Sequence, residues 1–511
     1  MVNKLRMVCF AALAFVCASL RAVEYVVPDY ERWPAFTDIH TQVSNALSCC
    51  QNGDVVTISA GVHELPDDAV TAFNTEKVGA WMAPDFYSGG VTLRGDPAAG
   101  RDGVVIRGGA TYAVVYVRNR ALRIEGLTFE DCANGRSRAV EGYQDFTYAW
   151  SGLVVSNCVF RGTEPKLGAG VRYATVVDCV FSNCFANSGG AAASCRVFNS
   201  AFCANEATMY GGALQSCPVV SNCVFTANVV SKYDGGALAE CGIVADCRFE
   251  RNFATRWGGA LFGCTDVRDC AFGSGNAVGG VVSQSSGAIG ANCSFTRCTF
   301  TGDQGNEAGS YAACIFTNMT VAPIANRANG AVALTNCLFA SSDVPGTLVR
   351  GGLLTEQPCT IVNCTFVDTR FGDVLLDMKH GEAKNNLFFT NWRMSGGTDV
   401  RNDVTVRVST GGEFWMRNNA YGVAPEGLGA AGEGNFQIAN PRFSKGAISG
   451  APYWSLQATP RNRQVRYGGL VEDWMASATD LAGAPRLCDG KVGIGCYACD
   501  LNEVGFRLHV R

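Results

Sequence analysis

A motif of about 23 residues recurs through the middle of this 511-residue chain and constrains its fold more than any other feature. A typical copy has Asn or Asp, then Cys, a variable residue and Phe, followed by Asn and later by Gly-Gly-Ala. A fixed period of this length is the signature of a solenoid, whose repeats pack only on their neighbours. The recurring positions are Cys179, Cys223, Cys247 and Cys270; Phe181, Phe202, Phe225 and Phe249; Asn205, Asn228 and Asn252; and Gly189, Gly190, Gly211, Gly212, Gly235, Gly236, Gly258 and Gly259.

The spacing within one copy predicts short strands separated by corners. Cys223 and Phe225 share one face of a strand, and the residue between these two positions varies and is Arg248 in the next copy. An apolar residue such as Val220 precedes the Cys by three positions, an odd spacing that requires a bend between them. The Asn or Asp just before the Cys tolerates left-handed backbone, and the Gly-Gly pair predicts a second corner.

These patterns predict an all-β fold, a right-handed, single-stranded parallel β-helix with an N-terminal cap and an irregular C-terminal cap. Helical repeats would need longer segments with 3.6-residue periodicity, and a β-propeller needs about 40 residues per blade. We expect the N-terminal cap and first coil in residues 23–90, with a helix over 36–49, and the repeats in 91–400, clearest in 153–389. Residues 401–511 are expected to hold the last coil and a capping segment.

Residues 1–22 are typical of a signal peptide. Lys4 and Arg6 precede an apolar stretch over 7–20, and Ala18 or Ala22 offers a cleavage site. A retained anchor is the alternative, although the stretch is shorter than the roughly 20 residues that cross a bilayer. We expect an exported chain that is secreted, at the cell surface or associated with the outer membrane, with no membrane span once the peptide is removed.

The charge balance argues against a nucleic-acid partner. The chain has 41 Lys and Arg against 45 Asp and Glu, a formal net charge of −4, whereas proteins that bind nucleic acids carry a basic patch. It has only four His, which argues against chemistry that relies on several histidines.

Cysteine is abundant, with 25 residues, and most of the regular ones fall in two columns of the repeat. Adjacent coils would lie close enough for disulfides between stacked cysteines. Buried thiols that pack as small apolar side chains are the alternative that we favour, because Ser200 fills one place in a column. The pairing of any disulfides stays open. The two columns are Cys158, Cys179, Cys223, Cys247 and Cys270, then Cys195, Cys217, Cys241 and Cys264.

The pairing of Phe-x-x-Asn with Gly-Gly-Ala-Leu resembles the repeats of the polymorphic outer-membrane-protein family. The matching copies are Phe202 with Asn205, Phe225 with Asn228, and Phe249 with Asn252. The resemblance implies a β-helical, adhesin-like passenger. Residues 52–61, 440–443, 480–486 and 492–497 resemble the opening and closing segments of secreted bacterial right-handed β-helix repeat proteins, which implies the same fold and export.

Tyr210, Tyr233 and Trp257 lie close before successive Gly-Gly corners, so stacked coils would align them. A strip of aromatic side chains suits carbohydrate binding. The alternative that we favour is packing of a loop on the flank of the solenoid.

Two further groups of residues are weaker candidates for chemistry. One is a charged cluster that could be catalytic but is more typical of a solvated face. The other is a possible tetrahedral zinc site, against which a disulfide or cap packing is favoured. The glycine-rich run 427–432 lacks the strand and helix of a dinucleotide site and is rejected. The charged cluster is Arg370, Asp373, Asp377, Lys379, His380 and Glu382, and the zinc candidates are Cys488, Cys496, Cys499 and His509.

The sequence therefore predicts a binding or adhesin-like scaffold without catalytic residues, cofactor or metal. Its expected partner is a carbohydrate or another surface protein. The alternative is a polysaccharide lyase or glycoside hydrolase that acts on an acidic polysaccharide on the same fold, because a fold does not decide an activity.

Overall fold

The structure is a computed structural model. It describes residues 22–29, 31–32, 39–65, 79–82, 90–108, 113–117, 121–132, 138–142, 152–162, 170–278, 290–291, 293–303, 305–306, 309–325, 331–353, 357–423, 431–439, 441, 443 and 463–497. The chain divides into two compact units, Met1–Phe181 and Ser182–Arg511. Most of the predicted signal peptide lies outside the described residues.

In unit 1 the helix α2 (Ile39–Cys49), close to the helix predicted over 36–49, follows the first strand. The unit contains three parallel sheets. The first contains β1 (Glu24–Val27), β2 (Val55–Ile58), β5 (Val91–Gly95), β8 (Leu122–Glu125), β11 (Val154–Ser156) and β14 (Thr175–Val177). The second contains β3 (Gly61–Glu64), β6 (Val104–Arg107), β9 (Thr128–Glu130) and β12 (Val159–Arg161). The third contains β4 (Gly79–Met82), β7 (Ala113–Val117), β10 (Arg138–Gly142) and β13 (Val171–Arg172).

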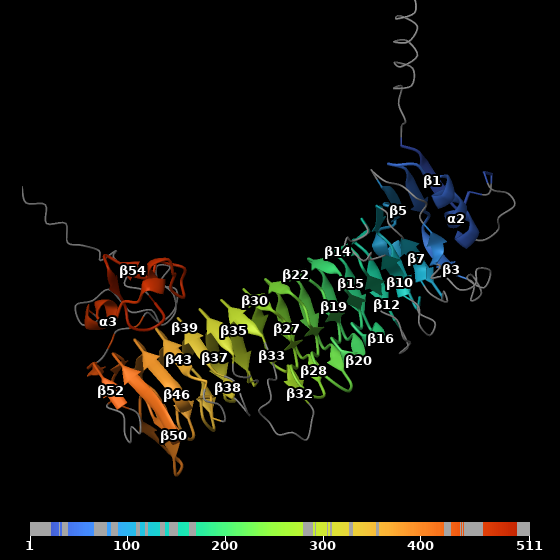
Figure 1. The fold of residues 1–511 in the computed structure, drawn as a ribbon. Helices are drawn as coiled ribbons and strands as arrows, with labels where there is room; N and C mark the ends of the chain where they lie inside the picture. The colour runs from blue at the N-terminus through green and yellow to red at the C-terminus, as the bar shows by residue number, and fades with distance from the viewer. Residues whose placement is uncertain are drawn as a thin grey trace, which may run out of the picture. The chain divides into compact units, whose positions relative to one another are not determined.

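In unit 2 each coil contributes short strands to separate parallel sheets, drawn in green to red in Figure 1. One sheet holds β18 (Arg196–Phe198), β22 (Val219–Ser221), β26 (Ile243–Ala245) and β30 (Asp266–Arg268). The next holds β19 (Ala201–Cys203), β23 (Val224–Thr226), β27 (Arg248–Glu250) and β31 (Ala271–Phe272). A third holds β16 (Phe185–Ser188), β20 (Glu206–Tyr210), β24 (Val229–Val230), β28 (Phe253–Ala254) and β32 (Ala277–Val278). A fourth holds β17 (Ala192–Ala193), β21 (Leu214–Gln215), β25 (Leu238–Ala239) and β29 (Leu261–Phe262).

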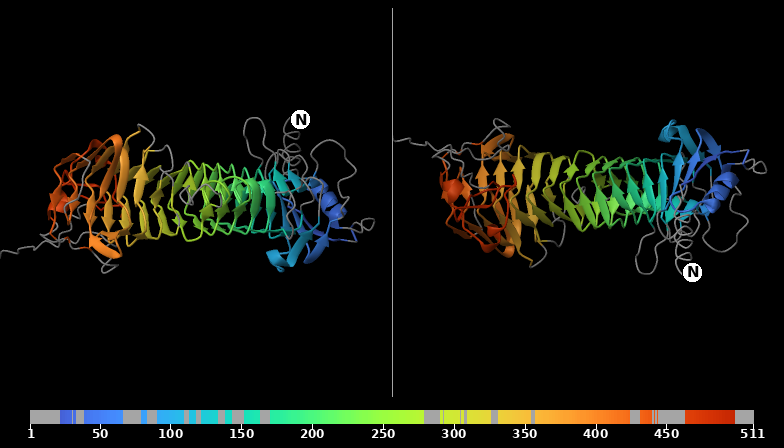
Figure 2. Two further views of the ribbon diagram at one scale, coloured as in Figure 1. Left: turned by 90° about the horizontal axis from the view of Figure 1, so that it is seen from below. Right: turned by 90° about the horizontal axis from the view of Figure 1, so that it is seen from above.

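Equivalent residues of successive coils pair directly, so that Phe202, Phe225, Phe249 and Phe272 form one column. Figure 2 shows the stacked strands from two further sides. The predicted fold class, an all-β parallel β-helix, is confirmed.

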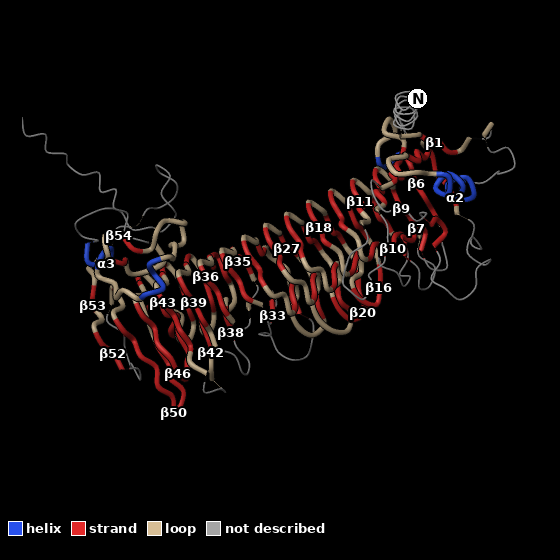
Figure 3. Tube along the Cα trace, turned by 45° about the horizontal axis from the view of Figure 1, so that its top comes forward, coloured by secondary structure: helices blue, strands red, loops and turns tan. Residues whose placement is uncertain are grey.

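The corners lie where the residue types require them (Figure 3). The residue before the repeat Cys has left-handed backbone, with φ of +53° at Asn222 and +55° at Asp246, which confirms the predicted bend. Arg297 takes the same conformation, so the corner does not depend on Asn or Asp alone. At the second corner Gly235 has φ +74°, and a Cβ on Gly236 would lie 2.0 Å from the carbonyl oxygen of Gly259. Both predicted corners are confirmed, and each has a steric cause.

Stacked phenylalanines fill the core of both units. Phe129 and Phe160 stack at 5.2 Å in unit 1, and Phe225 and Phe249 stack at 5.0 Å in unit 2, with the rings nearly parallel. Val224 is 46% exposed although both of its neighbours, one of them Phe225, are buried, as the Cys-x-Phe alternation predicts. Each buried ring contributes about 1.5–3 kcal/mol of burial free energy, so the Phe column is a main source of stability.

None of the described cysteines forms a disulfide. The sulfur of Cys223 accepts the N–H of Ser200 in the preceding coil at 3.4 Å, and its S–H donates to the carbonyl of Ser221 at 3.1 Å. In the same way the sulfur of Cys270 accepts the N–H of Cys247, and its S–H donates to the carbonyl of Arg268. Burial raises the pKa of the Cys184 thiol to about 12, which keeps this side chain protonated at neutral pH.

Asparagine performs the same task at another corner. Asn228, which is fully buried, accepts the N–H of Asn205 on its side-chain oxygen at 3.1 Å and donates to the side-chain oxygen of Asn252 at 2.9 Å. Further along the chain Asn386 stands in the Cys column, where it accepts the N–H of Cys364 at 2.8 Å. Cys and Asn therefore replace each other, because both satisfy a buried backbone N–H.

Residues 463–497 of the predicted C-terminal capping segment pack on the flank of unit 2, beside β40 (Leu338–Ala340), β44 (Thr365–Val367) and β47 (Leu387–Phe389). The outward-facing Leu338 and Val367 are buried under Cys496 and its neighbours. Asn336 and Asn385 donate to the carbonyls of Thr479 and Leu470, at 2.9 and 2.8 Å. Among the described residues no helix is long and apolar enough to cross a membrane.

Replacing the acceptor in the Cys column tests its role. We expect Cys223→Ser to change the free energy of unfolding little, because a hydroxyl accepts and donates in the same place. Cys223→Val keeps an apolar side chain but leaves the N–H of Ser200 unsatisfied, so we expect a loss of about 1–3 kcal/mol. Denaturant unfolding of both variants measures the difference, and equal losses would contradict the role of the sulfur.

A methyl group at the tight corner tests the steric account. We expect Gly236→Ala to lose about 3 kcal/mol or more, or to prevent folding, because the new Cβ overlaps backbone of the next coil. Gly346→Ala is the control, since a Cβ there meets no atom within 4 Å. Thermal unfolding compares the two, and an unchanged midpoint for Gly236→Ala would disprove the corner assignment.

Candidate functional site

The predicted aromatic strip is only partly a continuous stack. The rings of Tyr210 and Tyr233 lie 5.6 Å apart at 15°. The backbone register pairs Tyr210 with Asp234, and the N–H of Gly235 bonds to the carbonyl of Trp257. Tyr233 is therefore one position out of the column, because its coil has one additional residue before the Gly-Gly corner. The faces of the two tyrosines lie against each other, which leaves their edges for a ligand.

Arg256 completes this group. Its guanidinium carbon lies 5.0 Å from the ring centre of Tyr233 and 4.3 Å from that of Trp257, so Arg256 contacts both rings. Asp234, which is fully buried, binds the guanidinium through two contacts of 2.8 and 2.5 Å and raises the pKa of Arg256. The result is a rigid group of Tyr210, Tyr233, Arg256 and Trp257, with Trp257 40% exposed. We call it the aromatic column.

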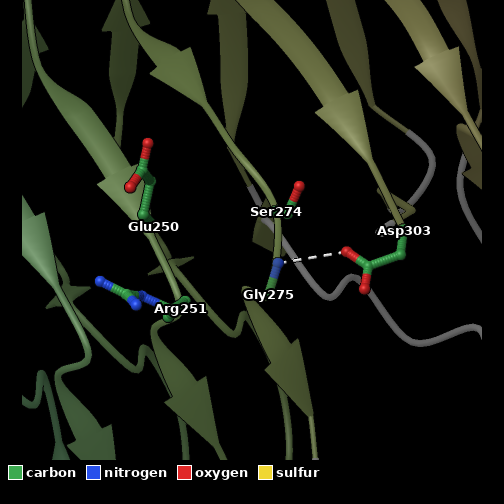
Figure 4. A pocket seen from close by; sticks show the side chains of 5 residues that line it. All are labelled: Glu250, Arg251, Ser274, Gly275 and Asp303. Carbon is green, nitrogen blue, oxygen red and sulfur yellow. Dashed lines mark hydrogen bonds between the residues drawn. The ribbon is translucent and has the colours of Figure 1, made fainter.

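A polar pocket lies beside the start of β28, whereas Trp257 of the aromatic column follows the end of that strand (Figure 4). Glu250, Arg251, Ser274, Gly275 and Asp303 line it. The carboxylate of Asp303 accepts the N–H of Gly275 at 3.1 Å, which joins two coils across the pocket. The pocket lies at the corner between β27 and β28, and its lining residues come from this corner of successive coils.

A sheet face connects the pocket to the aromatic column. In β20, β24 and β28 the residues Ala207, Val230 and Ala254 point inward and are fully buried. Their neighbours Val229 and Phe253 point outward and are half-buried. The candidate face, as we define it, consists of the outward side chains of these three strands, the aromatic column and the pocket. Its three strands pair in register across successive coils, so the face is elongated and suits an extended ligand.

The charged cluster predicted as a possible catalytic site does not converge on one point. Asp377 on β46 (Leu376–Lys384) lies between Arg350 on β42 (Val349–Gly351) and Arg407 on β50 (Val406–Arg417), at 3.0 and 2.5 Å. Its side chain is only 4% exposed. Arg407 also binds Asp373 at 2.9 Å, and its hydrogen bond to Asp377 raises the pKa of Arg407. Charges of opposite sign thus alternate from coil to coil.

The other members of that cluster pair elsewhere. Arg370 binds Asp343 and Asp399 at 2.6 and 3.0 Å. Glu382 binds Lys384 at 3.2 Å, and the ring nitrogen Nδ1 of His380 accepts the N–H of Glu413 at 3.3 Å. Lys379 follows Met378 on β46. Sequence reasoning missed Arg350 and Arg407 because only the strand register brings them beside Asp377.

The zinc candidates are not assembled in the part of the chain that the structure describes. Cys488 lies in β54 (Leu487–Cys488), whereas Cys496 is buried against Leu338 and Val367. Cys499 and His509 fall outside the described residues. The described residues contain no group of three metal-binding side chains.

No protein-family model matches this chain, and no curated protein matches it. Among solved structures it is similar to the PL6 family alginate lyase AlyGC, at 13% identity and a TM-score of 0.35, over 93% of this chain and 59% of the lyase. A mannuronic acid specific polysaccharide family 6 lyase from human gut microbiota has 13% identity and a TM-score of 0.35, over 78% of this chain and 86% of the lyase. The pectate lyase Pel9A has 11% identity and a TM-score of 0.24, over 94% and 97%. The chain spans less than two thirds of the length of AlyGC, and at these identities the likenesses extend to no activity or substrate.

Proposed function

We propose that this chain is an exported β-helix scaffold that binds carbohydrate on the candidate face and does not catalyse its cleavage. The observation that carries the non-catalytic part of the proposal is the pairing of Asp377 with Arg350 and Arg407. This carboxylate belongs to the group of charges with the greatest catalytic potential in the sequence. It is held between two guanidiniums, an arrangement that stabilises stacked strands.

Cleavage of an acidic polysaccharide would need a different arrangement. A lyase needs a base beside a cation that neutralises the substrate carboxylate, and a hydrolase needs two spaced carboxyl groups around the bond. Asp373 and Asp377 instead share Arg407, and Arg370 lies in a separate set of ion pairs. The alternating ion pairs of Arg350, Asp377 and Arg407 therefore favour a structural role for the charged cluster over the lyase or hydrolase alternative.

The candidate face has the composition of a carbohydrate site. It combines a half-exposed indole at Trp257, two phenols, a fixed guanidinium and a polar pocket. Sugars bind to such surfaces through apolar contacts with aromatic rings and hydrogen bonds to their hydroxyls. Secretion or display at the cell surface belongs to this proposal on the strength of the signal-peptide pattern, and an adhesin-like role belongs to it on the strength of the repeat resemblance.

The proposal predicts binding without products. Purified protein is incubated with a panel of neutral and uronate polysaccharides, and binding is measured by co-sedimentation or calorimetry. We expect Trp257→Ala to weaken binding about tenfold or more, the effect of removing a central aromatic contact. Trp415→Ala is the matched control, because Trp415 is also half-exposed and contacts Arg417 outside the candidate face. The appearance of unsaturated products or new reducing ends would overturn the proposal.

A further inference from the structure

The candidate face carries no excess of basic side chains. Arg256 is bound by the buried carboxylate of Asp234, and Arg248 binds Glu250 at 2.5 Å beside the pocket. In the pocket Arg251 lies with Glu250 and Asp303. With Glu206, which pairs with Val229 on the outward side of β20, and with the buried Asp234 counted, the face has two basic side chains, Arg251 and Arg256. Its acidic side chains are Glu206, Asp234, Glu250 and Asp303. The face therefore has no excess of positive charge.

We infer that the ligand of the candidate face is an uncharged polysaccharide. The inference rests on the proposed function, and it assigns a substrate class to the same site. A polyanion is attracted by unpaired cations and gains from releasing its counterions, as nucleic acids do. Here an anionic sugar that approached Arg256 would also approach Asp234, whose charge is fully buried and is therefore poorly screened by solvent.

Arg256 is suited to a neutral ligand. Asp234 engages Nε and Nη2 of the guanidinium, two of the three nitrogens, and the side chain stays 41% exposed. A guanidinium has five N–H donors, so further donors can reach sugar hydroxyl and ring oxygens. Because the two aromatic rings and Asp234 fix its orientation, little conformational entropy is lost when these donors bind a ligand.

The pocket supports the same class of ligand. The carboxylate of Glu250 accepts from Arg248 through Oε1, and the negative charges of Glu250 and Asp303 oppose the approach of a uronate. Between the pocket and the aromatic column, Val229 and Phe253 offer half-buried apolar surface, and Glu206, which pairs with Val229, adds a carboxylate and no positive charge. A neutral glycan can lie on this surface and donate hydroxyl hydrogen bonds at the pocket and accept them at Arg256.

The test compares neutral polymers, such as glucan, mannan, galactan and xylan, with anionic ones, such as polygalacturonate, alginate and hyaluronan, on the full chain. We expect a neutral polymer to bind at least tenfold more tightly than any anionic one, with an affinity that changes less than twofold between low and moderate salt. Anionic polymers that bind as tightly or more tightly would overturn the inference and leave carbohydrate binding intact. Failure of every polymer to bind would instead refute the proposed function.

Two variants test the charge argument without requiring that the correct neutral polymer is in the panel. We expect Asp234→Asn, which leaves Arg256 unneutralised, to gain salt-sensitive binding of polygalacturonate of about tenfold. Glu250→Gln changes the charge at the pocket rim without touching a fully buried group, and covers the case in which Asp234→Asn fails to fold. If a folded variant of either kind binds polygalacturonate no better than the original protein, the charge argument is wrong.

Discussion

The structure depends on satisfying backbone N–H groups at the corners of stacked coils. Between corners, strands bond to the coils on either side, but each corner turns the chain and places backbone polar groups beside an apolar core. A buried N–H without a partner costs about 1–3 kcal/mol, and the cost recurs in every coil. Cys223 and Asn228 meet this need at two corners of one coil, by accepting an N–H from the coil before. The repeat is therefore a solution to a hydrogen-bonding problem as much as to a packing problem.

Much of the fold could be predicted because its causes are local. The Cys-x-Phe alternation, the left-handed Asn222 and the crowded Gly236 each lie within a few residues of the feature that they determine. The hydrogen-bonding role of Asn228 was missed, since its partner Asn252 becomes a neighbour only when coils stack in register. Sequence spacing predicts the columns, whereas the contacts within a column need the coordinates.

The candidate site shows where prediction from the sequence ends. Tyr233 is out of line with Tyr210 and Trp257 because one coil is a residue longer, and that residue, Asp234, became the buried partner of Arg256. Asp377 was grouped with residues near it in sequence, although its partners are Arg350 and Arg407, one coil away on either side. Small changes in coil length thus decide which side chains come into contact. The average repeat length read from the sequence does not reveal these changes.

The account also requires the column cysteines to be thiols, because a sulfur in a disulfide has no S–H to donate to a carbonyl. Mass spectrometry after alkylation without reductant tests this requirement most directly, first on the folded protein and then after unfolding. The account predicts that exposed Cys49 and Cys203 react in the folded protein, and that column residues such as Cys223 and Cys247 react only after unfolding. Peptides of adjacent coils joined through their column cysteines would contradict it.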